Sequence, residues 1–202
     1  QSYFLHRLNQ HQLARVLFVI SDIDKTKPNP TTLDLDVASL MRTWEDDYSQ
    51  SILRSVRFDT GAREEAYDRF RGAFTAAYRE RYPVDEALID TAEIMSARDD
   101  ETIRVRAYRM PGDADNILRC KFYARGDVLA LSATVPILEN MGLFVDSEVN
   151  FELHLQKSAF HAAQRIHVHD IECRSTDGKA VDLERAGPLF EQAFAAVWTE
   201  RA

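Results

Sequence analysis

The spacing of apolar residues divides the chain into a strand, a helical region and a second half rich in strands. Residues 14–21 (ARVLFVIS) form a short, almost continuous apolar run, which is typical of a strand buried on both faces and therefore central in its sheet. From Leu33 to Val56, apolar residues recur at helical spacing. Residues 61–98 continue with further helical stripes that break at Pro83. The first half thus predicts one strand followed by helices.

In the second half the apolar pattern changes from a helical period to strict alternation. Residues 102–110 and 116–125 alternate between apolar and polar side chains on either side of a turn that contains Pro and Gly, which predicts a β-hairpin. A short helix is expected near 132–141, with a left-handed stop at Gly142. The remaining predicted elements are two strands and a C-terminal helix, at 143–153, 163–174 and 183–198.

The order of these elements predicts an α+β fold with a ferredoxin-like β-α-β-β-α-β antiparallel sheet. We expect a single module over residues 1–202, in which 61–98 is a helical insertion and the strand 163–174 and the last helix are additions. In this arrangement the first and third strands are central, which suits the apolar run at 14–21. Helices are expected to cover one face of the sheet, and the other face is expected to point outward.

Basic side chains gather on the outward side of the predicted hairpin: Arg104, Arg106, Arg119, Lys121 and Arg125. A sheet that binds nucleic acid would interleave more aromatic residues for stacking than Tyr108 and Tyr123. We therefore interpret this basic face as an interface, either pairing across strands with Asp146 and Glu148 or docking onto an acidic neighbouring domain.

The composition is that of an ordinary globular protein, with 45% hydrophobic and 29% charged residues among 202. The net charge of −8 disfavours nucleic acid and anionic membranes as partners, and no apolar run is long enough to span a bilayer. Cys120 and Cys173 have no metal or redox spacing, which predicts reduced thiols in a cytoplasmic protein. The chain starts at Gln1 without a signal-peptide pattern, and we interpret it as a piece of a longer protein.

Asp22 and Asp24 stand one residue apart in the segment VISDIDKT, directly after the first predicted strand. Phosphatases of the haloacid-dehalogenase type present a nucleophile and an acid–base partner in this way. Such an enzyme also needs a parallel doubly wound sheet and a later acidic pair for Mg²⁺. This chain instead predicts antiparallel strands, and Lys25 stands where those phosphatases carry glycine. The two aspartates are predicted to be solvated loop residues, and the phosphatase is the less favoured alternative.

Two further patterns could carry chemistry but are predicted to be structural. His167 and His169 share one strand face, yet the spacing places no third metal ligand. Trp44 is followed by three successive acids, which cannot face one another on a helix. The sequence contains no Gly-rich dinucleotide motif and no P-loop. We therefore expect no catalytic, cofactor-binding or metal-binding residues in this chain.

Six short motifs follow one another along nearly the whole chain: RTWEDD at 42–47, AAYRE at 76–80, RAYR at 106–109, LENMGLFV at 138–145, HD at 169–170 and FEQAFAAVW at 190–198. In this order they resemble the amino-terminal half of the large bacterial NAD-specific glutamate dehydrogenases. The resemblance implies an ACT-like regulatory and assembly module, with the catalytic domain further toward the carboxyl end. It carries no catalytic residue onto this chain.

The resemblance also implies a cofactor and partners. The parent enzyme would use NAD to oxidise L-glutamate to 2-oxoglutarate and ammonia, whereas this fragment would hold no cofactor. Its partners would be the other domains and subunits of a homo-oligomer, together with an amino-acid effector. A stand-alone ACT domain that senses an amino acid is the alternative.

Overall fold

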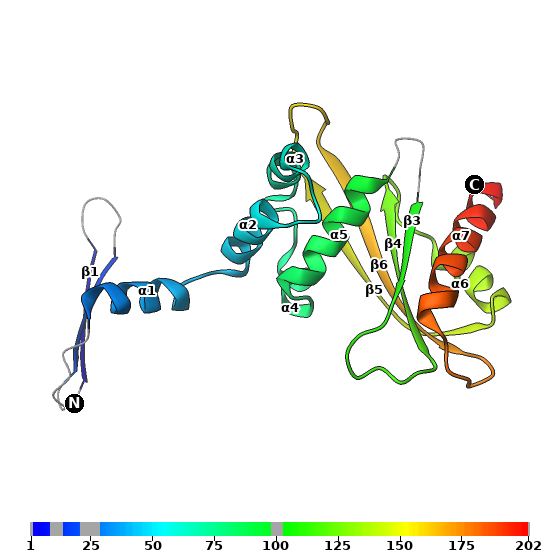
Figure 1. Ribbon diagram of the computed structural model, residues 1–202, viewed down its shortest axis with the longest axis horizontal. Coiled ribbons are helices and arrows are strands. Elements are labelled where there is room, and N and C mark those ends of the chain that lie inside the picture. Colours follow the sequence, from blue (N-terminus) through cyan, green and yellow to red (C-terminus); the bar gives the residue numbers. More distant parts are fainter. Residues whose placement is uncertain (1, 9–13, 21–28, 98–102, 202) are drawn as a thin grey trace. The chain divides into compact units, whose positions relative to one another are not determined.

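The computed structural model describes residues 2–8, 14–20, 29–97 and 103–201, which fall into two compact units, Gln1–Arg42 and Thr43–Ala202. The first unit contains an antiparallel pair of strands, β1 (Ser2–Leu8) and β2 (Ala14–Ile20), and helix α1 (Pro30–Leu40). Figure 1 labels β1 and α1. Within the described ranges, no helix is both long and apolar enough to cross a membrane.

Strand β2 forms where the apolar run at 14–21 predicts it, but its expected place at the centre of the main sheet is wrong. It pairs with β1 in a separate two-stranded sheet. The reason is local, because the segment SYFLHRL at 2–8 is a second strand-forming run close by in the sequence. That run was not predicted as a strand.

The second unit begins with four helices: α2 (Trp44–Arg54), α3 (Thr60–Phe70), α4 (Ala76–Arg81) and α5 (Val84–Ser96). The predicted stripe from Leu33 to Val56 is therefore two helices, α1 and α2. The helix is interrupted there because Thr43 starts α2 with a capping box. The Thr43 hydroxyl accepts a hydrogen bond from the Asp46 N–H at 3.2 Å, and the Asp46 carboxylate accepts one from the Thr43 N–H at 3.0 Å.

A four-stranded antiparallel sheet follows, with the spatial order β3-β4-β6-β5. Its elements along the chain are β3 (Ile103–Tyr108), β4 (Ile117–Arg125), α6 (Leu131–Asn140), β5 (Leu143–Leu155), β6 (Gln164–Ser175) and α7 (Leu183–Arg201). Strands β4 and β5 are parallel, are joined through α6 and are separated by β6. This is the split βαβ arrangement of ferredoxin-like sheets, so the predicted α+β, ferredoxin-like class is confirmed.

The assignment of the central strands differs from the prediction. The strand at 116–125 is central as expected, but its central neighbour is β6, which was expected to be an addition. The edge beside β4 is occupied by β3, the strand that precedes it in the sequence. Alternation alone could not distinguish these pairings, because all four segments share the same period.

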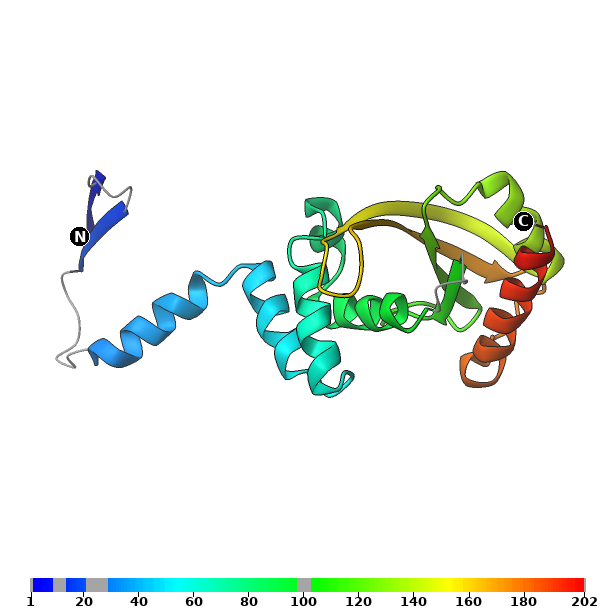
Figure 2. The same ribbon diagram turned by 90° about the horizontal axis from the view of Figure 1, so that it is seen from above.

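Both faces of the sheet are covered by helices. The apolar side chains of β5 and β6, such as Phe151 and Val168, pack with helices α2–α5 in one core. The alternate side chains of the strands pack with α6 and α7 in the other core, where the rings of Phe122 and Phe194 lie 4.7 Å apart. Helix α5 runs beneath the arched strands in Figure 2. The prediction of an outward sheet face is therefore wrong, because helices α2–α5 form a second layer on that face.

Candidate functional site

Lys121 lies fully buried at the centre of a charge cluster between helix α5 and strand β4. Its Nζ lies 2.6 Å from Glu86 Oε1 and 2.7 Å from Asp90 Oδ2, and both acids belong to α5. Their four-residue spacing places them on one face of the helix. The ammonium also lies 3.9 Å from the centre of the Tyr82 ring, which is a cation–π contact. The charge of this lysine is therefore compensated by the docked helix.

Arg106 supplies the second cation of the cluster, from the position directly across from Lys121 on β3. Its Nη2 binds Glu86 and lies 3.4 Å from Asp90 Oδ1. Burial opposes the charge of this side chain, but Tyr123 and the two acids together raise the pKa of Arg106 above its ordinary value. Each of the two acids thus contacts both cations.

Asp90 is the most completely hydrogen-bonded acid of the cluster. Tyr78 and Tyr123 donate their hydroxyls to it at 2.5 and 2.7 Å. Burial, reinforced by the Asp90 carboxylate, raises the pKa of both tyrosines well above the ordinary range. Both hydroxyls therefore remain protonated donors at any physiological pH.

Asp170 on β6 extends the cluster across the sheet. Its Oδ2 accepts hydrogen bonds from the hydroxyls of Tyr82 and Tyr108, the second at 2.7 Å. Its Oδ1 is buried and has no hydrogen-bond partner among the residues that the structure describes. Burial, followed by the charge of Asp170, raises the pKa of both tyrosines. Through these contacts β6 is linked to Tyr82, the residue that caps α4, and to Tyr108, the last residue of β3.

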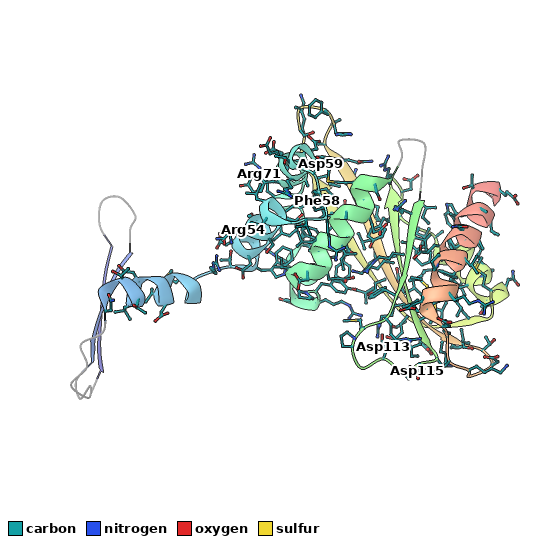
Figure 3. All side chains as sticks on the ribbon, viewed as in Figure 1. Arg54, Phe58, Asp59, Arg71, Asp113 and Asp115 are labelled. Atoms are coloured by element: carbon teal, nitrogen blue, oxygen red, sulfur yellow. The ribbon has the colours of Figure 1, made fainter. Side chains whose placement is uncertain are left out.

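The five predicted basic residues are not a free surface. Besides Arg106 and Lys121, two more of these residues contact α5. Arg104 Nε lies 2.7 Å from Glu93 Oε2 on this helix. Arg125 Nη2 donates a hydrogen bond of 2.9 Å to the carbonyl of Ala97, the residue that caps the end of α5. Arg119 instead contacts Asp113 at 2.8 Å and Glu172 at 2.6 Å. Asp113, labelled in Figure 3, lies on the loop between β3 and β4. Four of the five thus meet helix α5.

The alternative pairing across strands with Asp146 and Glu148 does not occur. Asp146 contacts Arg174 at 2.6 Å, and Glu148 contacts His169 Nδ1 at 2.7 Å. Both acids lie on β5, which is separated from β4 by β6.

Among the other candidate residues, His169, Glu45 and Asp46 have structural partners. The rings of His167 and His169 lie 6.5 Å apart, and His169 Nε2 accepts the Leu129 N–H at 3.2 Å. In the parts of the chain that the structure describes, no three His, Cys, Asp or Glu residues are placed to hold a metal. Of the acids after Trp44, Asp46 closes the capping box and Glu45 accepts the Gly72 N–H at 2.6 Å. Asp22 and Asp24 lie outside the described residues.

The arrangement fixes a helix on a sheet. Two cations, Arg106 and Lys121, and the acids Glu86 and Asp90 satisfy one another where the two layers meet. A buried ion network specifies one docking geometry, because any displacement leaves charges unpaired. Glu86, Asp90 and Glu93 were missed as site residues, although their spacing forms an acidic stripe that matches the basic hairpin.

The fold and this interface together define a ferredoxin-like α+β domain with a helical layer docked on its sheet. Residues 102–186 match the family described as glutamate dehydrogenase, ACT3 domain, and residues 57–96 match glutamate dehydrogenase, helical motif 2. In these two stretches the chain is thus similar to domains of glutamate dehydrogenases.

Two relatives are NAD-specific glutamate dehydrogenases. The protein from Pseudomonas aeruginosa is 29% identical over 90% of this chain, and the protein from Halomonas elongata is 25% identical over 96%. The chain spans only 11% and 12% of their lengths. A stretch of 27 residues is 70% identical to the tRNA-specific 2-thiouridylase MnmA of Paraburkholderia phymatum; it covers 13% of this chain and 7% of that protein. So short a stretch defines no domain.

Proposed function

We propose that this chain is a non-catalytic assembly and regulatory module of a large NAD-dependent glutamate dehydrogenase. The whole protein converts L-glutamate, NAD and water to 2-oxoglutarate, ammonia and NADH, with NAD bound outside this module. The partners of the module are the other domains and subunits of a homo-oligomer. The relatives and the two matched domains support this assignment.

The observation that carries the assembly role is the buried charge cluster around Lys121 and Asp90. It joins helical motif 2 to the ACT3 sheet in one compact unit. A rigid unit of this kind can hold neighbouring domains at a fixed spacing, because the helix cannot slide on the sheet without separating buried charges.

The test uses the full-length enzyme that carries this chain. Deletion of residues 43–201 is expected to reduce the oligomer measured by light scattering and to lower dehydrogenase activity. Lys121→Glu is expected to act in the same direction, because it places a third carboxylate beside Glu86 and Asp90. Lys157→Glu, at an exposed loop position, is the matched control. An unchanged oligomer and unchanged activity after the deletion would exclude the assembly role.

A further inference from the structure

Strand β3 lies at one edge of the main sheet, and helix α7 packs along it (Figure 1). An edge strand has backbone N–H and C=O groups that face away from its partner, and another chain can add a strand there. These groups belong to alternate residues, because antiparallel strands alternate between residue pairs that exchange hydrogen bonds and pairs that do not. Whether β3 can accept a further strand therefore depends on what these groups contact.

Ala107 is a residue of β3 whose backbone faces this edge. Its N–H donates to Glu191 Oε1 on α7 at 2.7 Å, which places the N–H on the side of β3 away from β4. The N–H of Val105, two residues earlier, is directed to the same side. A carboxylate oxygen thus takes the place that a carbonyl of an added strand would occupy.

The packing of α7 holds Glu191 at this edge. Gly187 lies four residues before Glu191 and therefore on the same face of the helix. Gly187 is buried, and a Cβ built on it would lie 3.7 Å from the Ala107 Cβ, so the helix approaches the strand closely here. Phe194, on the next turn, is buried in the same core as Val105. The carboxylate is therefore positioned by the docked helix.

The surroundings of Glu191 are unfavourable for a solvated carboxylate. Glu191 is half-buried, and burial is the largest of the effects that raise its pKa; the charge of Glu93 on α5 adds to this rise. The hydrogen bond from Ala107 and the charges of Arg104 and Arg106 act in the opposite direction. Arg104 Nε also lies 2.7 Å from Glu93 Oε2. Charged side chains from α5, β3 and α7 thus meet along this edge, and charge of this kind discourages the pairing of edge strands.

We propose that Glu191 closes the β3 edge and prevents a second copy of this chain from pairing its own β3 there. Without this carboxylate, two β3 edges can pair antiparallel about a two-fold axis, because each presents the same groups to the other. The hydrogen bond to Glu191 competes directly with that pairing, and the charge of Glu191 would lie against the carbonyl groups of the incoming strand. The proposal rests on this edge alone and goes beyond the assembly role, because it names a surface through which copies do not associate.

Light scattering of the 202-residue chain over a range of concentrations tests the proposal. Glu191→Ala removes the acceptor, and we expect its mass to rise toward twice that of the wild type as the concentration increases. Glu191→Gln keeps an oxygen that can accept from Ala107, and we expect it to behave like the wild type. Glu200→Ala makes the same change at an exposed position of α7 and is the matched control. Wild-type mass for Glu191→Ala at every concentration, or equal association of Glu191→Gln or Glu200→Ala, would overturn the proposal.

Amide hydrogen exchange locates the contact. We expect the Ala107 N–H to be protected in the dilute wild type and to exchange roughly tenfold to hundredfold faster in dilute Glu191→Ala, the effect of losing a hydrogen bond to a charged group. At high concentration this variant should regain protection at Ala107 and gain it at Val105. Protection there that does not rise with concentration would place the association elsewhere and refute the proposal. Unprotected Ala107 in the wild type would refute it as well, and this measurement holds even if Glu191→Ala fails to fold.

Discussion

Replacing Lys121 with methionine tests whether the charge cluster holds the helical layer on the sheet. Methionine keeps most of the apolar stem and removes the ammonium. Glu86 and Asp90 then lose the contacts of 2.6 and 2.7 Å that compensate their charge. Arg106 still contacts both acids.

Removing one partner of a buried ion pair usually costs 3–5 kcal/mol, and because Arg106 remains we expect the lower end, about 3 kcal/mol. With a urea dependence of about 2 kcal/mol per molar, this cost corresponds to a midpoint lowered by about 1.5 M. Both tryptophans, Trp44 and Trp198, lie in the second unit. Tryptophan fluorescence during urea unfolding therefore reports on this unit alone.

Two comparisons sharpen this test. Lys157→Met, at an exposed loop position, is expected to change stability by less than about 0.5 kcal/mol. The double variant Lys121→Met with Glu86→Gln is expected to cost less than the sum of the single variants, because the second change removes an uncompensated carboxylate. A loss below about 1 kcal/mol in Lys121→Met, or strict additivity in the double variant, would refute the reasoning.

Three further predictions concern stability, each checked by the urea midpoint. Thr43→Ala removes the capping box with Asp46 and should cost about 1 kcal/mol; no change would mean that the cap does not define the start of α2. Gly142→Ala should cost about 1 kcal/mol, because this glycine adopts φ of 81° after α6; a neutral or stabilising effect would contradict this. The hydrogen bond from Arg119 is the largest of the effects that hold the pKa of Asp113 below its usual 3.8. The ionised carboxylate of Asp113 therefore stabilises the fold above about pH 4, and this stabilisation is lost as the pH falls through the lowered pKa. Asp113→Asn should destabilise the protein at pH 7 and make its stability depend less on acid pH. An acid dependence like that of the wild type would argue against this role.

The sequence predicts the strands of the main sheet well, because the alternation of apolar and polar residues along a strand does not depend on which strand it pairs with. Strands β4 and β6 lie close to their predicted bounds of 116–125 and 163–174. The pairing of the strands was less predictable. The apolar run at 14–21 looks like a central strand, but its partner is set by a neighbouring segment rather than by its own hydrophobicity.

The basic hairpin shows why burial of charge is hard to predict. Lys121 alternates with apolar residues and looks like a solvated side chain, yet it is fully buried. Only the acids on α5 indicate that Lys121 is buried, because a lysine ammonium is buried where carboxylates pair with its charge. The acidic stripe of Glu86, Asp90 and Glu93 carries that signal, and it becomes convincing only when it is matched to the cations of a distant strand.

The position of β6 between β4 and β5 has a consequence for how the chain is synthesised. Each hairpin, β3–β4 and β5–β6, is local, but the contact between β4 and β6 at the sheet centre joins residues 117–125 to 166–174. On the ribosome the amino-terminal helices and the first hairpin emerge earlier, and β4 remains an open edge until β6 is made. A nascent chain paused before residue 164 therefore presents Cys120 and Phe122 beside unpaired backbone, and this is the stage at which the domain most needs protection from aggregation.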